Sequence, residues 1–310
     1  MSAPPDHWGN NFTTNHSRAE GPTDPSNNQL PPNFVVVVTG AGKGLGYHIA
    51  LAYAKAGAHG LCISSRTQKD LDDLSAELRG INPKLDILAR TCDTRKIEDV
   101  IKLADEVKGR FGRADVVIAN AGVISNYIYD GPDGSNRRLP IGVIEDDDFA
   151  RVIDINLTGS WRVARYFVPL LRDTEDGAKT FIVISSAAAH CEDSKLTPIA
   201  YNLSKIATNR MAEHIHNDHY AKDGILAYAV HPGAVVTPQT ELHSTQKGDL
   251  WERILGDDIG LCGGFLTWLT KERRDWLSGR YLRANWDVEE LEKKKDEIVQ
   301  GDKLKFRMVI

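Results

Sequence analysis

The chain has 310 residues, of which 41% are hydrophobic and 26% are charged, which is the composition of an ordinary globular protein. Its net charge of −5, from 38 basic and 43 acidic residues, offers no basic surface of the kind that binds nucleic acid. The sequence has no apolar run near the ~20 residues that span a membrane, so we expect neither nucleic acid nor a membrane as a partner.

The N-terminus and the cysteines indicate the cellular compartment. The first ten residues are polar and lack the apolar core of a secretory signal. The four cysteines lie far apart and form no CxxC pair, so we expect reduced thiols, and neither a disulfide framework nor a zinc site. They are Cys62, Cys92, Cys191 and Cys262. A cytoplasmic protein is therefore predicted.

Residues 1–33 are rich in Pro, Asn, Ser, Thr and Asp and contain few large apolar side chains. Such a segment buries too little surface to offset its ordering entropy. We therefore predict a flexible N-terminal arm, with docking of a partner as the less favoured alternative.

From Phe34 onward, short β-branched runs alternate with longer amphipathic segments. The predicted strands lie at residues 34–40, 60–65, 85–91, 115–122, 180–186, 224–230 and 279–285. The helical segment at 96–112 carries apolar residues at helical spacing, namely Ile97, Val100, Ile101, Ala104 and Val107. Strands separated by helices predict an α/β fold with a doubly wound parallel sheet of about seven strands and helices on both faces. Residues 34–310 are expected to form one domain.

The first strand leads directly into TGAGKGLG, residues 39–46, and a helix follows. Glycines in this turn let backbone amides approach a pyrophosphate at the helix N-terminus. The candidate residues are Gly40, Lys43, Gly44, Leu45 and Gly46. A plain turn is the alternative, but the strand–turn–helix context favours nucleotide binding.

The second strand ends in ISSR, residues 63–66, without the carboxylate that usually holds the ribose of NAD. Arg66 can receive a 2′-phosphate, Ser65 can hydrogen-bond it, and Lys43 adds a second cation. NADP is therefore the predicted cofactor. The alternative is that Arg66 is an ordinary surface residue at a strand end.

The stretch YNLSK, residues 201–205, places Tyr201 and Lys205 on one face of a helix, about one turn apart. An ammonium group close to a phenol favours the phenolate and lowers the tyrosine pKa. The pair is either an acid with its tuning cation or an ordinary surface pair.

Six motifs occur in the order found in short-chain dehydrogenases/reductases, which the chain resembles over residues 34–285. They are TGAGKGLG (39–46), ANAG (119–122), IDINLTG (153–159), ISS (184–186), YNLSK (201–205) and HPGAVVT (231–237). The ending WDVEEL, residues 286–291, is similar to that of fungal members. The resemblance implies a Rossmann-like single domain, NAD or NADP, and a homodimer or homotetramer.

The resemblance also implies roles for individual residues. Tyr201 would be the general acid/base, Lys205 its tuning cation, Ser186 the anchor of the substrate oxygen and Asn156 the anchor of a proton-relaying water. Asp93 would meet the adenine. The other implied cofactor contacts are Asn120, Ala121 and Gly122 on the adenosine side, and Pro232, Gly233, Val235 and Thr237 beside the nicotinamide. This chemistry requires no metal.

Four segments either depart from the family pattern or have a role that the sequence leaves undecided. The stretch between Gly122 and Asn156 is longer than usual, and its residues 125–150 either shape the substrate site or form a solvated loop. A long spacing between Ser186 and Tyr201 leaves His190 or Cys191 near the pocket. Residues 238–262 are the predicted substrate cover, and 286–310 a charged C-terminal extension. The apolar residues of the cover form a substrate wall or simply pack on the domain; they are Leu242, Leu250, Trp251, Ile254 and Leu255.

The sequence therefore predicts an NADP-dependent oxidoreductase of the alcohol dehydrogenase or carbonyl reductase type (EC 1.1.1), which reduces a ketone with NADPH. Two alternatives stay open. One is a non-catalytic NADP-binding scaffold or sensor, and the other is a reductase that also steers cyclisation or isomerisation of its product. The three histidines at positions 214, 216 and 219 spread around a helix and do not favour a metal site.

Overall fold

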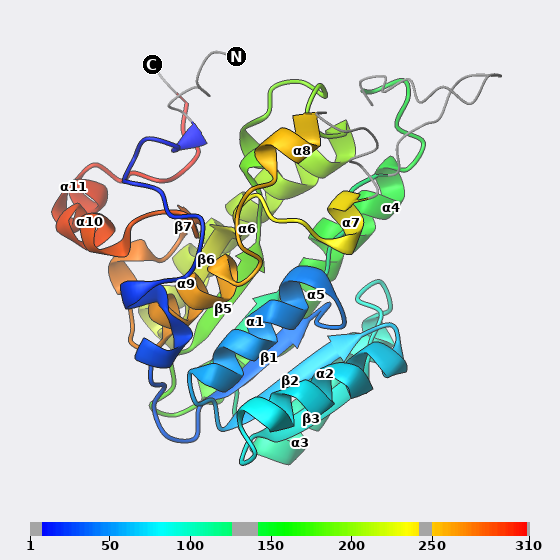
Figure 1. The fold of residues 1–310 in the computed structure, drawn as a ribbon, viewed down its shortest axis with the longest axis vertical. Coiled ribbons are helices and arrows are strands. Elements are labelled where there is room, and N and C mark those ends of the chain that lie inside the picture. The colour runs from blue at the N-terminus through cyan, green and yellow to red at the C-terminus, as the bar shows by residue number, and fades with distance from the viewer. Residues whose placement is uncertain (1–7, 126–141, 242–249, 309–310) are drawn as a thin grey trace.

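A single seven-stranded sheet forms the centre of the protein (Figure 1). The computed structural model describes residues 8–125, 142–241 and 250–308. The strands are β1 (Val35–Thr39), β2 (Gly60–Ser65), β3 (Asp86–Thr91), β4 (Val116–Ala119), β5 (Thr180–Ile184), β6 (Leu226–His231) and β7 (Arg280–Arg283). All neighbours pair in parallel, in the order β3-β2-β1-β4-β5-β6-β7. The predicted doubly wound, Rossmann-like α/β fold is confirmed.

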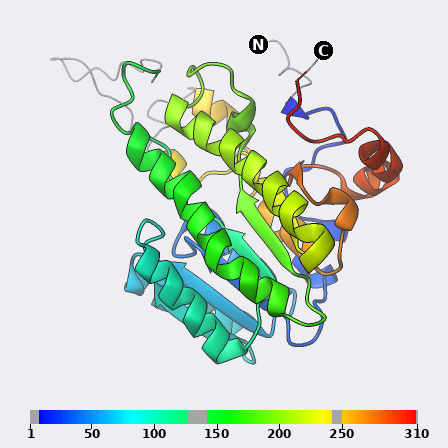
Figure 2. The same cartoon turned by 180° about the vertical axis from the view of Figure 1, so that it is seen from behind.

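Helices cover both faces of this sheet. They are α1 (Gly44–Lys55), α2 (Gln68–Ile81), α3 (Ile97–Phe111), α4 (Phe149–Ile153), α5 (Gly159–Asp173), α6 (Ile199–Asp223), α7 (Pro238–Glu241), α8 (Leu250–Ile254), α9 (Leu261–Thr270), α10 (Val288–Lys293) and α11 (Lys295–Gln300). Buried side chains of α1, α2 and α9 share one core layer, and those of α3, α5 and α6 share the other. Figure 2 shows the second set from behind the sheet.

The two core layers follow from the alternation of side chains along fully buried strands. In β1, Val36 and Val38 belong to the layer under α1, whereas Val37 belongs to the opposite layer. In α3 the buried face consists of Val100, Leu103, Ala104 and Val107. The expected apolar face of this helix was partly wrong, because Ile97 and Ile101 lie at its edge and are each 36% exposed.

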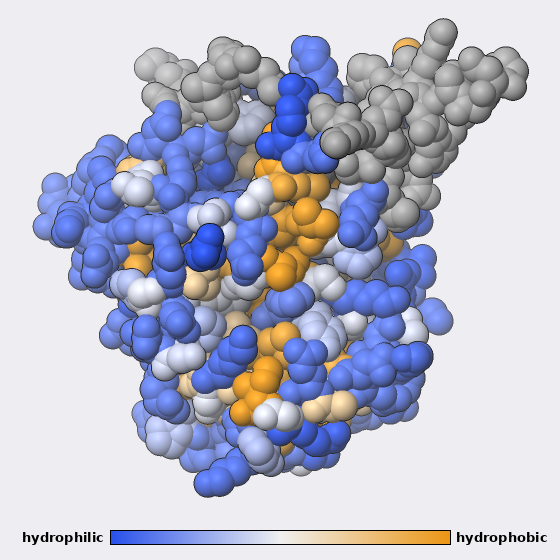
Figure 3. Space-filling model, in the orientation of Figure 1, coloured by the Kyte–Doolittle hydropathy of each residue, from blue (hydrophilic) through white to orange (hydrophobic). Residues whose placement is uncertain are grey.

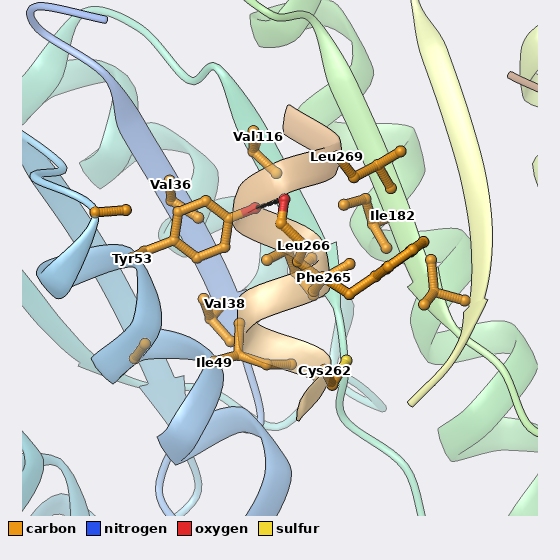
Figure 4. Packing of buried hydrophobic residues seen from close by; sticks show 14 of the residues in the cluster. Val36, Val38, Ile49, Tyr53, Val116, Ile182, Cys262, Phe265, Leu266 and Leu269 are labelled. Carbon is orange, nitrogen blue, oxygen red and sulfur yellow. Dashed lines mark hydrogen bonds between the residues drawn. The ribbon is translucent and has the colours of Figure 1, made fainter. Parts of the chain in front are cut away.

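A buried tyrosine joins α1 to α9 inside the first layer (Figure 4). The Tyr53 hydroxyl donates to the Leu266 carbonyl at 3.2 Å and lies 2.9 Å from the Thr270 hydroxyl. Phe265 and Leu269 of α9 pack in the same cluster. The phenol can stay buried because its polar end has partners.

The N-terminal segment, residues 8–33, differs from the expected flexible arm. It packs beside α9 and the C-terminal helices (Figure 1), with Leu30 buried and the Phe12 ring 5.2 Å from that of Trp286. The Trp286 indole donates to the Gly9 carbonyl at 2.8 Å, and His16 lies 2.8 Å from Asp287. These anchors stabilise a segment that its composition alone would leave disordered. Residues 1–7 lie outside the described part of the chain.

The C-terminal extension is a packed pair of short helices, α10 and α11. Its charged residues face outward, while Val288, Leu291 and Ile298 are buried. Asp287 caps α10 by accepting from the Glu290 amide at 2.8 Å. The extension and the N-terminal segment thus bury one another beside the edge strand β7.

The crossovers reverse direction between β1 and β4, which are neighbours in the sheet. In open α/β sheets, ligands bind beyond the carboxyl ends of the strands at such a switch point. The glycine loop, the ANAG motif and Ser186 all follow strands that end at this edge. Within the described ranges, no helix combines the length and apolar character needed to cross a membrane.

Gly264 in α9 provides a test of how tightly the N-terminal segment is held. A Cβ atom at this position would collide with the Thr23 carbonyl oxygen and the Ala19 side chain. We expect Gly264→Ala to lower the free energy of unfolding by about 1–3 kcal/mol through overpacking, measured by urea denaturation.

Gly109 in α3 is the matched control, because a Cβ atom there would meet nothing within 4 Å. Gly109→Ala should raise stability by about 0.5–1 kcal/mol, as expected for a helical glycine. If both substitutions raised the free energy of unfolding by the same amount, this result would contradict the packing of residues 19–23 on α9.

Candidate active site

The glycine loop lies directly against the end of β4. Gly40 has φ +66°, and a Cβ atom on it would lie 2.8 Å from the Ala121 Cα. A Cβ atom on Gly46 would lie 2.5 Å from the Asn120 side-chain nitrogen. These positions exclude side chains, so the backbone between β1 and α1 stays open to a phosphate group at a helix N-terminus. The cradle fits a dinucleotide.

Asn120 holds this loop in place. Its Nδ2 donates to the Thr39 carbonyl at 2.9 Å and to the Gly40 carbonyl at 3.1 Å. Its backbone amide donates to the Thr39 hydroxyl at 3.1 Å. Asn120 was expected among the adenosine contacts, and the structure gives its amide group a bracing role between β1 and β4.

At the end of β2, the predicted cations lie among acids. Lys43 is 3.4 Å from Asp70, and Arg95 forms an ion pair with Asp93 at 2.5 Å. The Arg95 guanidinium holds the pKa of Asp93 below its usual range, with a smaller contribution from Arg66. Because Asp70 and Asp93 are each paired with another cation, the exposed Arg66 faces this end of the cavity without a carboxylate partner among the described residues.

The Ser65 hydroxyl is used locally, since it donates to the Thr67 carbonyl at 3.0 Å and accepts from the Thr67 amide at 3.2 Å. It still lines the cavity.

Lys205 is the buried centre of the site. Its side chain is 5% exposed, and its Nζ donates to the Ile184 carbonyl, at the end of β5, at 2.8 Å. The ammonium lies 5.3 Å from the centre of the Tyr201 ring. Burial lowers the pKa of Lys205 to about 8. The predicted proximity of Tyr201 and Lys205 is therefore found, with the lysine buried and the tyrosine half-buried on the cavity wall.

Burial opposes the lowering of the Tyr201 pKa by Lys205, and that lowering stays a prediction. Burial raises the pKa of Tyr201 to about 12, and a hydrogen bond with Ser186 acts in the opposite direction. Desolvation of the phenolate is the larger of these two effects on the pKa.

The two serines after β5 have separate tasks. Ser185 is buried and donates to Asn209 at 2.5 Å. The Ser186 hydroxyl accepts from the Ala188 amide at 3.1 Å, capping the short 3₁₀ helix Ala187–His190. That bond leaves the Ser186 proton for an oxygen in the cavity, which is the Tyr201 oxygen in this structure and the substrate oxygen in the predicted role.

Asn156 lies in a π-helical turn, Asp154–Thr158, between α4 and α5. Its Oδ1 accepts from the Val123 amide at 2.8 Å, and its Nδ2 donates to the Val123 carbonyl at 2.8 Å and to Ser204 at 3.0 Å. The side chain clamps the chain after β4 onto α6. Anchoring of a water, as the resemblance implies, stays a prediction.

Two residues outside the predicted set also shape the site. The buried His231 accepts from the Ala187 amide through Nδ1 at 3.1 Å, and burial keeps its pKa well below the usual value. Asp257 accepts from Ala234 at 2.7 Å and supports the loop at Gly233, whose φ is +95°. The motif HPGAVVT contained the signal for His231, but no local pattern indicates Asp257.

These residues surround one cavity of about 610 Å³. The predicted residues on its wall are Gly40, Lys43, Gly44, Leu45, Gly46, Ser65, Arg66, Asp93, Asn120, Ala121, Gly122, Ser186, Tyr201, Lys205, Pro232, Gly233, Val235 and Thr237. Asn156 is not among the wall residues and acts through Val123. In the face of the molecule that Figure 3 shows, apolar side chains gather near the centre, between α1 and α8.

The predicted cover contributes Ile254 and Leu255 to the cavity wall. Leu242 and the centre of the 125–150 insertion lie outside the described residues. Two residues were expected near the pocket. The centre of the His190 ring lies 4.9 Å from that of the Tyr281 ring and 4.7 Å from that of the Phe306 ring. Cys191 is half-buried. Neither is among the residues that line the cavity.

The histidines of α6 make separate contacts. His216 lies 2.8 Å from Ser278, and His219 lies 2.7 Å from Asp223. In the part of the chain that the structure describes, no group of three His, Cys, Asp or Glu side chains is arranged to hold a metal. All four cysteines are free thiols.

Comparison with known proteins gives a consistent result. The model of the family described as short chain dehydrogenase matches residues 34–248. The short chain dehydrogenase pgmD of Aspergillus terreus is 41% identical over 318 residues, covering 100% of this chain and 98% of that protein. The short chain dehydrogenase mpl6 of Monascus purpureus is 35% identical over 278 residues, with 89% and 88% covered. The crystal structure of a short-chain type dehydrogenase/reductase from Mycobacterium marinum has a TM-score of 0.70 at 24% identity, with 83% and 95% covered.

The buried Lys205 predicts a distinctive pH dependence of stability. Below about pH 8, the folded and unfolded chains both hold the lysine proton, and the folded state bears the full cost of burying the charge. Between about 8 and the usual 10.5, the folded chain releases the proton that the unfolded chain still binds, so stability rises with pH. Relative to Lys205→Met, the wild type should gain on the order of 1–2 kcal/mol between pH 7.5 and 9.5.

The measurement is urea denaturation across this pH range. Lys55→Met, which removes an exposed lysine of α1, is the control and should follow the wild-type profile. Parallel profiles for the wild type and Lys205→Met would show that Lys205 does not titrate in this range.

Proposed function

The chain belongs to the short-chain dehydrogenase family, and from this premise we propose that it is an NADP-dependent carbonyl reductase that reduces a ketone of a small organic molecule. Membership makes it an oxidoreductase that uses a nicotinamide cofactor. The observation that carries the proposal is that Tyr201, Ser186 and Lys205 line the same cavity as the glycine loop.

The protein groups suit protonation of a carbonyl oxygen. The bound cofactor supplies the hydride, and the chain binds, orients and protonates. Ser186 accepts from the Ala188 amide, and its own proton is then the one to donate to the substrate oxygen. Tyr201 then donates its proton to the developing alkoxide. A pKa of about 12 keeps Tyr201 protonated at neutral pH, which is the form that reduction requires.

Lys205 supports this proton transfer. With a pKa of about 8, it is mostly cationic at neutral pH, and its bond to the Ile184 carbonyl fixes it beside Tyr201. A fixed ammonium opposes the negative charge left on the phenol after proton transfer. The lysine is thus placed to stabilise the phenolate of Tyr201. Burial is nevertheless the largest influence on the pKa of this group.

The preference for NADP rests on the end of β2. Arg66 lines the cavity there, and the nearby acids Asp70 and Asp93 are paired with Lys43 and Arg95. A 2′-phosphate would therefore meet the Arg66 guanidinium, while the carboxylates of Asp70 and Asp93 are already paired with other cations. The same phosphate preference supports NADPH-driven reduction as the direction.

A homodimer or homotetramer and a cytoplasmic location stay predictions. Apolar side chains on the outer faces of α5 and α6 support association of copies, since Trp161 is 46% exposed and Leu203 is 45% exposed. Single exposed apolar residues are common, so the support comes from the occurrence of such residues on both helices.

Tyr201→Phe tests the assigned chemistry. This variant should bind NADPH normally and lose carbonyl-dependent NADPH oxidation by at least about 100-fold, the scale of a general acid. The reaction is followed by absorbance with a panel of ketones and quinones. Tyr220→Phe, which changes a tyrosine on the same helix far from the cavity, should keep full activity. Turnover retained by Tyr201→Phe would refute the mechanism.

Arg66→Ala tests the cofactor preference. Loss of a charge-assisted bond to the 2′-phosphate should raise the Kd for NADPH by roughly 10-fold or more while leaving NADH within about twofold. Both constants come from fluorescence titration. Arg79→Ala, on the exposed face of α2, should change neither. Equal weakening of NADPH and NADH binding would exclude a phosphate contact by Arg66.

A further inference from the structure

The cavity contains a second arginine, Arg283, which is buried at the end of β7. Its side chain is 7% exposed, and Nη1 donates to the Trp8 carbonyl at 2.8 Å. Its Nε has no hydrogen-bond partner among the residues that the structure describes. Burying a guanidinium donor without a partner is costly, so such a group on a cavity wall indicates a missing acceptor.

The structure offers Arg283 no carboxylate among the described residues. Asp257 is the acid that influences it, but the Oδ2 of Asp257 accepts from Ala234 at 2.7 Å and from Asn285 at 2.9 Å. Burial lowers the pKa of Arg283, as expected for a cation that lacks a counterion. The other buried arginine of the strand, Arg280, contrasts with it, because Arg280 lies 3.3 Å from Asp302.

The position of Arg283 assigns it to the substrate end of the cavity. β7 is the last strand of the sheet, five strands from β2 and Arg66, or roughly 24 Å at the usual strand spacing. It is two strands from β5 and Ser186, or roughly 10 Å. The adenosine end of a cofactor on the glycine loop is therefore beyond the reach of Arg283, whereas a substrate held by Ser186 is not.

The surroundings complete a pocket around this guanidinium. Arg283 pairs in register with His231, which bonds to Ala187 beside Ser186. Trp8 and Asn10 of the N-terminal segment line the same cavity. This end of the cavity thus combines an aromatic side chain with a buried cation.

We propose that Arg283 binds an acidic oxygen of the substrate, a carboxylate or an ionised phenol or enol, so that the preferred substrates are ketones that carry such a group away from the carbonyl. The inference deepens the proposed function and rests on it. The acidic oxygen would accept from the part of the guanidinium that lines the cavity and neutralise the buried charge in a charge-assisted bond. A solely structural role for Arg283, holding the N-terminal segment through Trp8, would give no preference between acidic and neutral ketones.

Matched pairs of ketones test the proposal. 4-Acetylbenzoate and 4′-acetylbiphenyl-4-carboxylate provide two spacings between carbonyl and carboxylate, and their methyl esters are the neutral partners. 4-Hydroxyacetophenone and 4-methoxyacetophenone at pH 9 provide the phenolate arm. Binding to the full-length protein with NADP⁺ is measured by calorimetry, and reduction is measured with NADPH.

We expect at least one acid to bind roughly 10-fold or more tightly than its neutral partner, the usual scale of a hydrogen bond to a charged group. Arg283→Met should remove this preference mainly through KM and leave the neutral ketones within about twofold. Arg283→Lys should restore part of it. Arg280→Met is the matched control and should keep the preference, since Arg280 contacts the C-terminal segment. Melting temperature and NADPH binding report whether each variant is folded.

The binding arm separates this inference from the proposed function. If acids bind preferentially but no ketone is turned over, the reductase assignment fails and the anion site stands. If the wild type binds every acid no more tightly than its neutral partner, the anion site is refuted whatever the variants do. An equal loss for acids and neutral ketones in Arg283→Met would likewise assign Arg283 a structural role.

Discussion

The site depends on one buried contact, the hydrogen bond from the Lys205 ammonium to the Ile184 carbonyl. It joins α6 to the end of β5, and through that junction it places Tyr201, one helical turn earlier, near Ser186, two residues past the strand. An ammonium in a dry environment is unfavourable, and the lowered pKa of Lys205 expresses that cost. A protein selected only for stability would place an apolar side chain here. The cost is understandable if the charge is needed when Tyr201 ionises.

Polar side chains around this contact serve as braces between strand ends. Asn120 ties the glycine loop to β4, and Asn156 ties the chain after β4 to α6. Parallel strands end at one edge of the sheet without hairpins to join them, so their carboxyl ends need side-chain bonds to hold a common geometry. A residue that appears in a cofactor or catalytic motif can therefore act by fixing the backbone that makes the contact. The π-helical turn around Asn156 belongs to the same arrangement, since such turns concentrate at functional sites.

Local patterns were sufficient to predict the sheet, the glycine loop and the Tyr201–Lys205 pair, because each depends on residues close in sequence. The packing of the N-terminal segment could not be predicted in this way. Its anchor Phe12 meets Trp286, and neither residue carries a local signal of the other. Composition indicated disorder since it counts only the apolar surface within the segment, whereas the burial is shared with a distant partner. Asp257 and Arg283 were missed for the same reason, as their roles arise only where separate strands and loops meet at the sheet edge.

The arginines at the two ends of the cavity differ in how strongly solvent screens their attraction for a negative charge. Arg66 is exposed at the end of β2, where water and salt screen its interaction with any phosphate. Arg283 is 7% exposed at the end of β7, where far less water reaches the guanidinium to screen it. A charge-assisted bond strengthens as water is removed, and the buried cation is already desolvated before the ligand arrives. On the proposed assignments, substrate selection by charge should be less sensitive to ionic strength than cofactor selection, because only the arginine at the cofactor end interacts through solvent.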